Sequence, residues 1–138
     1  MIKLNSSFTV YTVENLEAAK TFYSDQFGFE VAFENEWYLH LVSEAGVQVG
    51  FLLPDQPTQP PFFQKPYSGT GVIFSIEVED ADAAYADAAA NALNIVLPLR
   101  SEDWGQRHFC IEDPNGVHID IVQATDPTGD YQEGYAQD

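Results

Sequence analysis

Two segments of this chain resemble each other, and this internal duplication constrains the fold more than any other feature of the sequence. The Val-Glu-Asn at residues 13–15 matches the Val-Glu-Asp at residues 78–80, and the Ala-Ala at 18–19 matches the Ala-Ala at 83–84. All of these matches share one offset of 65 residues, from Val13 to Val78. A constant offset over so many positions is hard to obtain by chance, so the sequence predicts two copies of one structural unit.

Each copy is predicted to be a β-α-β-β-β module, which places the chain in the α+β class. An apolar, strand-like run opens each copy, and Asn15 or Asp80 then provides a side chain that can cap the start of a helix. Apolar runs bounded by turn residues predict three strands after each helix. These strands are expected at residues 30–35, 38–43 and 47–53 in the first copy, and at 94–97, 107–112 and 117–123 in the second.

The two modules are expected to form a single domain over residues 1–124. Module one covers residues 1–53, a Pro- and Gly-rich linker covers 54–71, and module two covers 72–124. The linker contains Phe62, Phe63 and Tyr67, which are too apolar for a plain spacer. Residues 125–138 show no core pattern and are predicted to be a loose C-terminal tail or an arm onto a partner subunit.

Charge and cysteine content restrict the class of partner. The chain has 22 acidic against 5 basic residues, a formal net charge of -17. Such a surface repels nucleic-acid phosphates and anionic lipid and attracts cations, so neither nucleic acid nor a membrane is an expected partner. Alternatively, the acidic composition can increase the solubility of the protein or reflect a salt-adapted source organism. The single cysteine, Cys110, excludes an internal disulfide and, with no signal-peptide pattern after Met1, fits a cytoplasmic location.

Several short motifs accompany the duplication. They are Val-Glu-Asn-Leu at 13–16, Phe-Tyr at 22–23, Gly-Phe at 28–29, Trp-Gly-Gln-Arg at 104–107 and Asp-Pro-Asn-Gly at 113–116. In this arrangement the chain resembles the vicinal oxygen chelate superfamily, which includes glyoxalase I, extradiol dioxygenases and bleomycin-resistance proteins. The Trp-Gly-x-Arg motif is most similar to the bleomycin-resistance branch. The resemblance implies a cupped mixed sheet with helices on its outer face, a ligand held in the cup, and a homodimer.

The resemblance also indicates where a metal would bind. Metal-dependent members carry His or Glu at four strand positions, which fall here on Phe8, about Gly50, Ile73 and Asp120. Phe8 and Ile73 cannot coordinate a metal and glycine has no side chain, so no metal and no cofactor is expected. A displaced site built from His40, His118 and Asp120 remains an alternative.

Covalent catalysis has little support in the sequence. Cys110 lies between Phe109 and Ile111 in a predicted strand and is expected to behave as a small buried apolar group. No nucleophile motif is present. Asp120, His118 or Glu77 could still act as a general base.

Apolar residues at the metal positions predict an apolar cup floor, ringed by aromatic side chains that stack well on planar ligands. Trp104, at a loop end before a strand, is the strongest candidate for a ligand contact. Arg107 could pair with an acid group of a ligand or with a protein carboxylate. The full set of expected ligand-binding residues is Trp104, Trp37, Tyr38, His40, Phe51, Phe62, Phe63, Asp120, Arg107, Phe8 and Ile73.

The predicted function is therefore a metal-independent small-molecule binding protein of the bleomycin-resistance type. It would sequester a bulky aromatic or cationic compound in a cup at a dimer. One alternative is an enzyme of the same superfamily, of lyase, dioxygenase or transferase type, that uses Asp120 or His118 as a base or a non-standard metal site. Another is a domain retained only for protein–protein association.

Overall fold

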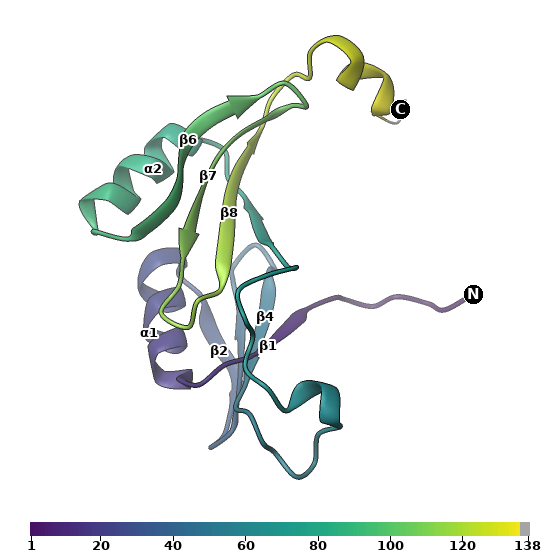
Figure 1. Cartoon of the computed structure of the whole chain (residues 1–138), viewed down its shortest axis with the longest axis vertical. Helices are drawn as coiled ribbons and strands as arrows, with labels where there is room; N and C mark the ends of the chain where they lie inside the picture. Colours follow the sequence, from purple (N-terminus) through teal and green to yellow (C-terminus); the bar gives the residue numbers. More distant parts are fainter. Residues whose placement is uncertain (136–138) are drawn as a thin grey trace. The chain divides into compact units, whose positions relative to one another are not determined.

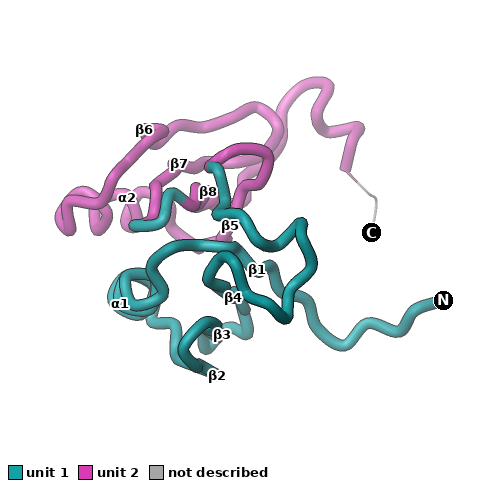
Figure 2. The backbone as a smooth tube through the Cα atoms, turned by 60° about the horizontal axis from the view of Figure 1, so that its bottom comes forward, with its two compact units in different colours: residues 1–68, 114–116 teal, residues 69–113, 117–138 magenta. Residues whose placement is uncertain are grey.

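The predicted duplication is present as two four-stranded mixed sheets, each accompanied by one helix (Figure 1). The structure is a computed structural model that describes residues 1–135. The chain divides into two compact units: unit 1 contains residues 1–68 and 114–116, and unit 2 contains the rest (Figure 2). Within the described residues, no helix is long and apolar enough to cross a membrane.

Unit 1 is built from β1 (Thr9–Thr12), α1 (Leu16–Phe27), β2 (Glu30–Glu34), β3 (Tyr38–Val42) and β4 (Gln48–Leu52). The strand order is β1-β4-β3-β2. β1 runs parallel to β4, and the other neighbours are antiparallel. All three strands predicted after the helix are present within a residue or two of their expected bounds.

Unit 2 repeats this connectivity. It contains β5 (Phe74–Glu77), α2 (Ala81–Ala90), β6 (Asn94–Glu102), β7 (Gln106–Glu112) and β8 (His118–Ala124). The order is β5-β8-β7-β6, with β5 parallel to β8 and the remaining pairs antiparallel. The α+β class and the β-α-β-β-β module are confirmed.

Both helices begin where the sequence predicts. The Asn15 side chain accepts a hydrogen bond from the Ala18 amide at 2.9 Å, and the Asp80 carboxylate accepts one from the Ala83 amide at 3.0 Å. These bonds satisfy backbone donors that the first helical turn leaves without partners. Gly28 caps the C-terminal end of α1, and its φ of 70° lies in the left-handed region that favours glycine.

Each helix covers one face of its own sheet. In unit 1 the fully buried Tyr23 of α1 packs against Phe51 of β4, with ring centroids 5.1 Å apart. In unit 2 Tyr85 of α2 packs edge-on against the buried Phe109 of β7, also at 5.1 Å. Since side chains alternate across a strand, the residues between these core positions point to the opposite face. We call this opposite face the open face of each sheet.

Strand β6 is longer than predicted. The sequence indicated residues 94–97, but the strand continues through Pro98 to Glu102. Pro98 is tolerated because β6 is an edge strand and its pairing with β7 shifts register between Leu97 and Arg100. The extension brings Glu102 into the sheet.

Most of the predicted linker is folded onto unit 1. It contains a short 3₁₀ turn, Pro61–Phe63. The Thr12 hydroxyl donates to the Phe63 carbonyl at 3.1 Å, and the Tyr67 amide donates to the Thr12 carbonyl at 2.7 Å. Two hydrogen bonds to β1 therefore hold this segment along the edge of the first sheet.

The first part of the predicted tail is also ordered by hydrogen bonds. The Thr125 amide donates to the Gly105 carbonyl and the Thr128 amide to the Asp103 carbonyl, both at 2.9 Å. The Tyr135 hydroxyl donates to the Trp104 carbonyl. Residues 125–135 thus lie against the turn between β6 and β7 instead of forming the loose segment expected from composition, and residues 136–138 lie outside the described part.

Candidate functional site

The open face of unit 1 contains an apolar pocket of about 420 Å³. Its lining combines four aromatic side chains with aliphatic and neutral polar ones. The lining residues are Val10, Thr12, Phe33, Asn35, Trp37, Tyr38, Leu52, Gln59 and Phe63.

Strand pairing explains why these side chains meet. Thr12 of β1 pairs with Leu52 of β4, and Leu52 pairs with Tyr38 of β3, so all three share the open face. Phe63 reaches them from the linker, which the bonds to Thr12 hold in place. The pocket floor therefore comes from the sheet, and the linker supplies one of its walls.

A chain of polar side chains runs beside the pocket. The Tyr38 hydroxyl lies 2.8 Å from His40 Nδ1, and His40 Nε2 lies 2.8 Å from the Gln48 carbonyl oxygen. The tautomer that satisfies both bonds has its proton on Nε2, with Nδ1 accepting from the Tyr38 hydroxyl. Burial raises the pKa of Tyr38 above its usual value, so the phenol is neutral at physiological pH.

Gly50 makes room for this polar chain. A Cβ placed on Gly50 would collide with the Tyr38 hydroxyl and would lie 3.0 Å from Val10 Cγ2. Glycine is therefore required at the centre of the sheet so that Tyr38 can lie across it and reach His40.

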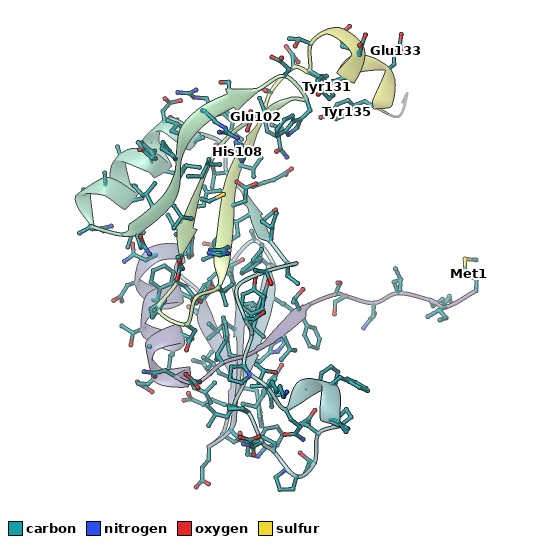
Figure 3. The ribbon with its side chains drawn as sticks, in the orientation of Figure 1. Met1, Glu102, His108, Tyr131, Glu133 and Tyr135 are labelled. Carbon is teal, nitrogen blue, oxygen red and sulfur yellow. The ribbon has the colours of Figure 1, made fainter. Side chains whose placement is uncertain are left out.

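The open face of unit 2 carries a polar cluster. His108 Nδ1 lies 2.7 Å from Asp120 Oδ1, and His108 Nε2 lies 2.8 Å from Glu102 Oε2. The Cys110 thiol donates to Asp120 Oδ1 at 3.5 Å. We call Glu102, His108, Cys110 and Asp120 the β7–β8 cluster; Figure 3 shows the labelled Glu102 and His108 near the β6–β7 end of unit 2.

The hairpin formed by β7 and β8 creates this cluster. Cys110 pairs with Asp120, and His108 lies two residues before Cys110 on the same face. Glu102 joins from the end of β6, where Arg100 donates to its carboxylate at 2.8 Å.

The charges in the cluster are coupled. Burial by itself lowers the pKa of His108, but hydrogen bonds and charge from Glu102 and Asp120 outweigh it and raise the pKa above its usual value. Hydrogen bonds from His108 and then from Arg100 lower the pKa of Glu102. Burial, reinforced by the Asp120 charge, raises the pKa of the Cys110 thiol to about 11. Without an added ion Cys110 is thus a neutral thiol and a poor nucleophile.

The metal positions implied by the family resemblance do not fit a metal. The Phe8 ring lies edge-on to His40 with centroids 4.5 Å apart. Gly50 is covered by Tyr38. Ile73 is an exposed apolar residue. Only Asp120 carries a ligating group, and it already contacts His108 and Cys110.

The expected ligand-binding residues of unit 1 separate into three groups. Trp37, Tyr38 and Phe63 line the pocket. His40 and Phe8 lie next to it through their contacts with Tyr38 and with each other. Phe51 is a correction, because it faces α1 with no exposed surface and belongs to the core.

Phe62 also differs from its neighbour. Its side chain is 79% exposed and is not part of the pocket lining, although its ring contacts Phe63 edge-on at 4.7 Å. Of the two adjacent phenylalanines, Phe63 therefore lines the pocket and Phe62 does not.

Of the ligand-binding residues expected in unit 2, Trp104 lies beside the β7–β8 cluster, whereas Arg107 and Ile73 do not belong to it. The Trp104 ring lies edge-on to His108, with centroids 6.3 Å apart, and its indole N–H donates to Gln106. Arg107 is a second correction, because it points to the helix side and forms two hydrogen bonds at 2.9 Å to Asp82 of α2. Ile73 is 66% exposed and belongs to neither the pocket nor the cluster.

The two residues that unit 2 would contribute to the displaced site considered from the sequence have different partners. His118 Nε2 lies 3.5 Å from Glu112, whereas the partners of Asp120 are His108 and Cys110. His108, Cys110 and Glu102 were not among the site residues expected from the sequence. The four-residue turn at 113–116 fixes the hairpin register and would have placed Cys110 opposite Asp120.

Comparisons with known proteins agree with the fold. The pattern of the Glyoxalase/Bleomycin resistance protein/Dioxygenase superfamily matches residues 6–121. A member of that superfamily from Sphaerobacter thermophilus is 26% identical with a TM-score of 0.69, over 87% of this chain and 98% of that one. A glyoxalase/bleomycin resistance protein/dioxygenase from Nocardioides has a TM-score of 0.75 at 17% identity, over 94% of this chain and 90% of that one.

A virulence protein from Salmonella typhimurium is 19% identical, with a TM-score of 0.70 over 91% of this chain and all of the other. None of the curated proteins matches the sequence. The family match spans most of the chain, and the duplicated modules are those the sequence resemblance implied. The chain belongs to the glyoxalase/bleomycin resistance protein/dioxygenase superfamily.

Gly50→Ala should displace the Tyr38 hydroxyl and lower the free energy of unfolding by about 1–3 kcal/mol, as overpacking does elsewhere. In a Tyr38→Phe background the colliding hydroxyl is absent, so the same change should cost less. Urea unfolding of the four proteins in this double-mutant cycle gives the coupling directly. Equal costs in the two backgrounds would show that Tyr38 is not what Gly50 accommodates.

The β7–β8 cluster predicts a pH-dependent contribution to stability. Because the pKa of His108 is raised in the folded protein, protonated His108 stabilises the fold. This stabilisation is complete below the ordinary pKa of 6.5 and is lost as the pH rises through the folded pKa. Because the pKa of Glu102 is lowered, ionised Glu102 also stabilises the fold. This stabilisation is complete above the ordinary pKa of 4.5 and is lost as the pH falls through the folded pKa. Between pH 4.5 and pH 6.5 both His108 and Glu102 therefore stabilise the folded protein.

Urea unfolding of the wild type and His108→Gln, with EDTA present, should show a larger difference in unfolding free energy at pH 5.5 than at pH 8.5. His118→Gln controls for loss of an imidazole elsewhere on the same hairpin. A difference that stays constant or grows with pH would contradict the assigned direction of the His108 shift.

Proposed function

We propose that this protein binds a planar, largely apolar aromatic compound in the unit 1 pocket and sequesters it without chemical change. The observation that carries the proposal is the pocket itself, about 420 Å³ in volume with four aromatic rings in its lining. Small-molecule sites typically have volumes of about 300–1,000 Å³ and mostly apolar and aromatic walls with a few polar groups.

The lining is suited to binding and poorly suited to catalysis. It contains no Asp, Glu, His, Lys, Arg, Cys or Ser. Tyr38 is its one ionisable side chain, and burial holds the phenol in its neutral form. Neutral polar groups of Thr12, Asn35 and Gln59 can orient a ligand, but none is a nucleophile activated by a neighbouring base. Nothing in this lining requires a metal, so binding is proposed to be metal-independent.

Charge supports a cationic ligand in preference to an anionic one. The formal net charge of -17 raises the local concentration of cations around the whole protein. Aromatic faces such as those of Trp37 and Phe33 attract cations through their quadrupoles. A bulky aromatic cation is also the kind of compound sequestered in the bleomycin-resistance branch that the sequence most resembles.

The alternative function is an enzyme that uses the β7–β8 cluster for proton transfer. The observation in its favour is the hydrogen-bonded row Glu102–His108–Asp120, since an imidazole between two carboxylates can exchange protons near neutral pH. An enzyme of this kind would turn over a bound compound with a pH profile that changes in Asp120→Asn. Recovery of the compound unmodified after long incubation supports sequestration instead.

Phe63→Ala should weaken binding of proflavine, a planar aromatic cation, by about tenfold or more, equivalent to roughly 1.4 kcal/mol. Phe62→Ala is the matched control and should change affinity by less than about twofold, because Phe62 lies outside the pocket lining. Quenching of Trp37 fluorescence reports binding, with Trp104→Phe as the background of every variant so that one tryptophan remains.

9-Anthracenecarboxylate, a planar anion, should bind more weakly than proflavine. Mass spectrometry should recover proflavine unmodified, and EDTA should leave its affinity unchanged. The absence of saturable quenching, or equal weakening by both phenylalanine substitutions, would count against binding in this pocket.

A further inference from the structure

The β7–β8 cluster contains three kinds of metal ligand in close proximity. His108 offers an imidazole nitrogen, Cys110 a thiolate sulfur and Asp120 a carboxylate oxygen. These ligand atoms all lie within 4.8 Å of one another. We propose that His108, Cys110 and Asp120 form a zinc site on the open face of unit 2, with Glu102 holding His108 in orientation.

Two of the three separations between the ligand atoms can be compared with those that a tetrahedral zinc ion requires, and the third, between His108 and Cys110, is within 4.8 Å. Zn–N, Zn–S and Zn–O bonds of about 2.0, 2.3 and 2.1 Å imply an S···O separation of about 3.6 Å and an N···O separation of about 3.4 Å. Cys110 Sγ and Asp120 Oδ1 are 3.5 Å apart, and His108 Nδ1 and Asp120 Oδ1 are 2.7 Å apart. The first pair already fits, and the second needs to open by about 0.7 Å, within reach of a small rotation of the Asp120 side chain.

Glu102 provides the outer support that metal-binding histidines usually have. A ligating histidine generally donates its second N–H to a carboxylate, which fixes the ring and its tautomer. His108 Nε2 lies 2.8 Å from Glu102, and Arg100 holds that carboxylate in turn. This bond keeps a proton on Nε2, so Nδ1 is the nitrogen available to the ion.

The identity of the ligands selects zinc over the commoner hard cations. Thiolate and imidazole favour Zn²⁺, whereas Mg²⁺ and Ca²⁺ prefer oxygen ligands throughout. Binding replaces the thiol proton and the proton between Nδ1 and Asp120, and both pass to solvent. Three protein ligands leave a fourth position for water.

The surroundings of the cluster suit an ion that is shielded yet reachable. The His108 and Asp120 side chains are 8% and 13% exposed, and Cys110 is half-buried. Of the metal positions implied by the family resemblance, this site uses only Asp120; its other two ligands come from β7, within the same hairpin. It also lies in a different unit from the aromatic pocket, so each proposal can fail without the other.

Cobalt substitution tests the site directly, with untagged full-length protein freed of metal by EDTA and desalted. Because Cys110 is the only cysteine in the chain, any thiolate-to-cobalt charge-transfer band in the near ultraviolet must arise from it. We expect that band, together with visible d–d bands of tetrahedral Co²⁺, and displacement of both by Zn²⁺. Cys110→Ser should abolish the charge-transfer band, and Glu102→Gln should weaken zinc binding by about 10–100-fold.

His118→Ala is the matched control, because His118 lies on the same hairpin but pairs with Glu112 and should leave cobalt and zinc binding unchanged. The proposal is overturned if Co²⁺ gives no charge-transfer band, or if His118→Ala weakens binding as much as Cys110→Ser. Circular dichroism shows whether each variant is folded.

A measurement on the wild type avoids the question of folding altogether. Zn²⁺, but not Mg²⁺, should protect Cys110 from alkylation by iodoacetamide, and EDTA should reverse the protection. Alkylation at the same rate with and without Zn²⁺ would overturn the site whatever the variants show.

Discussion

The aromatic contact between each helix and its sheet is the interaction on which the rest of this structure depends. Tyr23 against Phe51 in unit 1 and Tyr85 against Phe109 in unit 2 fix which face of each sheet is covered. Burial of rings of this size is among the largest single contributions to a small core. Because strand side chains alternate, fixing one face also decides which residues are left on the other. The side chains left on the uncovered faces line the pocket in unit 1 and form the β7–β8 cluster in unit 2.

The two copies of the module use corresponding positions for different purposes. Gly50 pairs with His40 across the centre of the first sheet, and Asp120 pairs with Cys110 at the corresponding place in the second. One copy therefore has a glycine where the other has a carboxylate. The glycine admits Tyr38 beside an apolar pocket, whereas the carboxylate collects an imidazole and a thiol. The duplication has kept the backbone and changed the chemistry of the open face.

Much of the fold could be predicted from the sequence because its signals are local. The constant offset, the capping residues Asn15 and Asp80, and the turns bounding the strands each depend on a few neighbouring residues. Strand β6 was predicted too short because proline usually ends a strand, and only the sheet order shows that Pro98 lies at an edge. The attachment of residues 125–135 depends on hydrogen bonds to a distant turn and leaves no pattern in composition.

The site was harder to predict because it depends on which way each side chain points. The run around Phe51 is apolar on both faces of its strand, so no alternation shows that Phe51 faces α1 while Gly50 faces the pocket side. Arg107 is adjacent to His108 in sequence but on the opposite face, next to Asp82. The proximity of His108 and Asp120 could in principle have been predicted from the hairpin turn, which sets the strand register. The position of Glu102 could not, because it depends on the unexpected length of β6.

We propose different ligands for the open faces of the two units: an aromatic compound in unit 1 and zinc in unit 2. Amide chemical shifts of isotope-labelled, metal-free protein, titrated separately with proflavine and with Zn²⁺, test this claim most directly. We expect proflavine to shift amides around the pocket, including Tyr38, Leu52 and Phe63, and Zn²⁺ to shift those of His108, Cys110 and Asp120. If both probes shifted one common set of amides, or if neither shifted its assigned set, the division of roles between the two units would be contradicted.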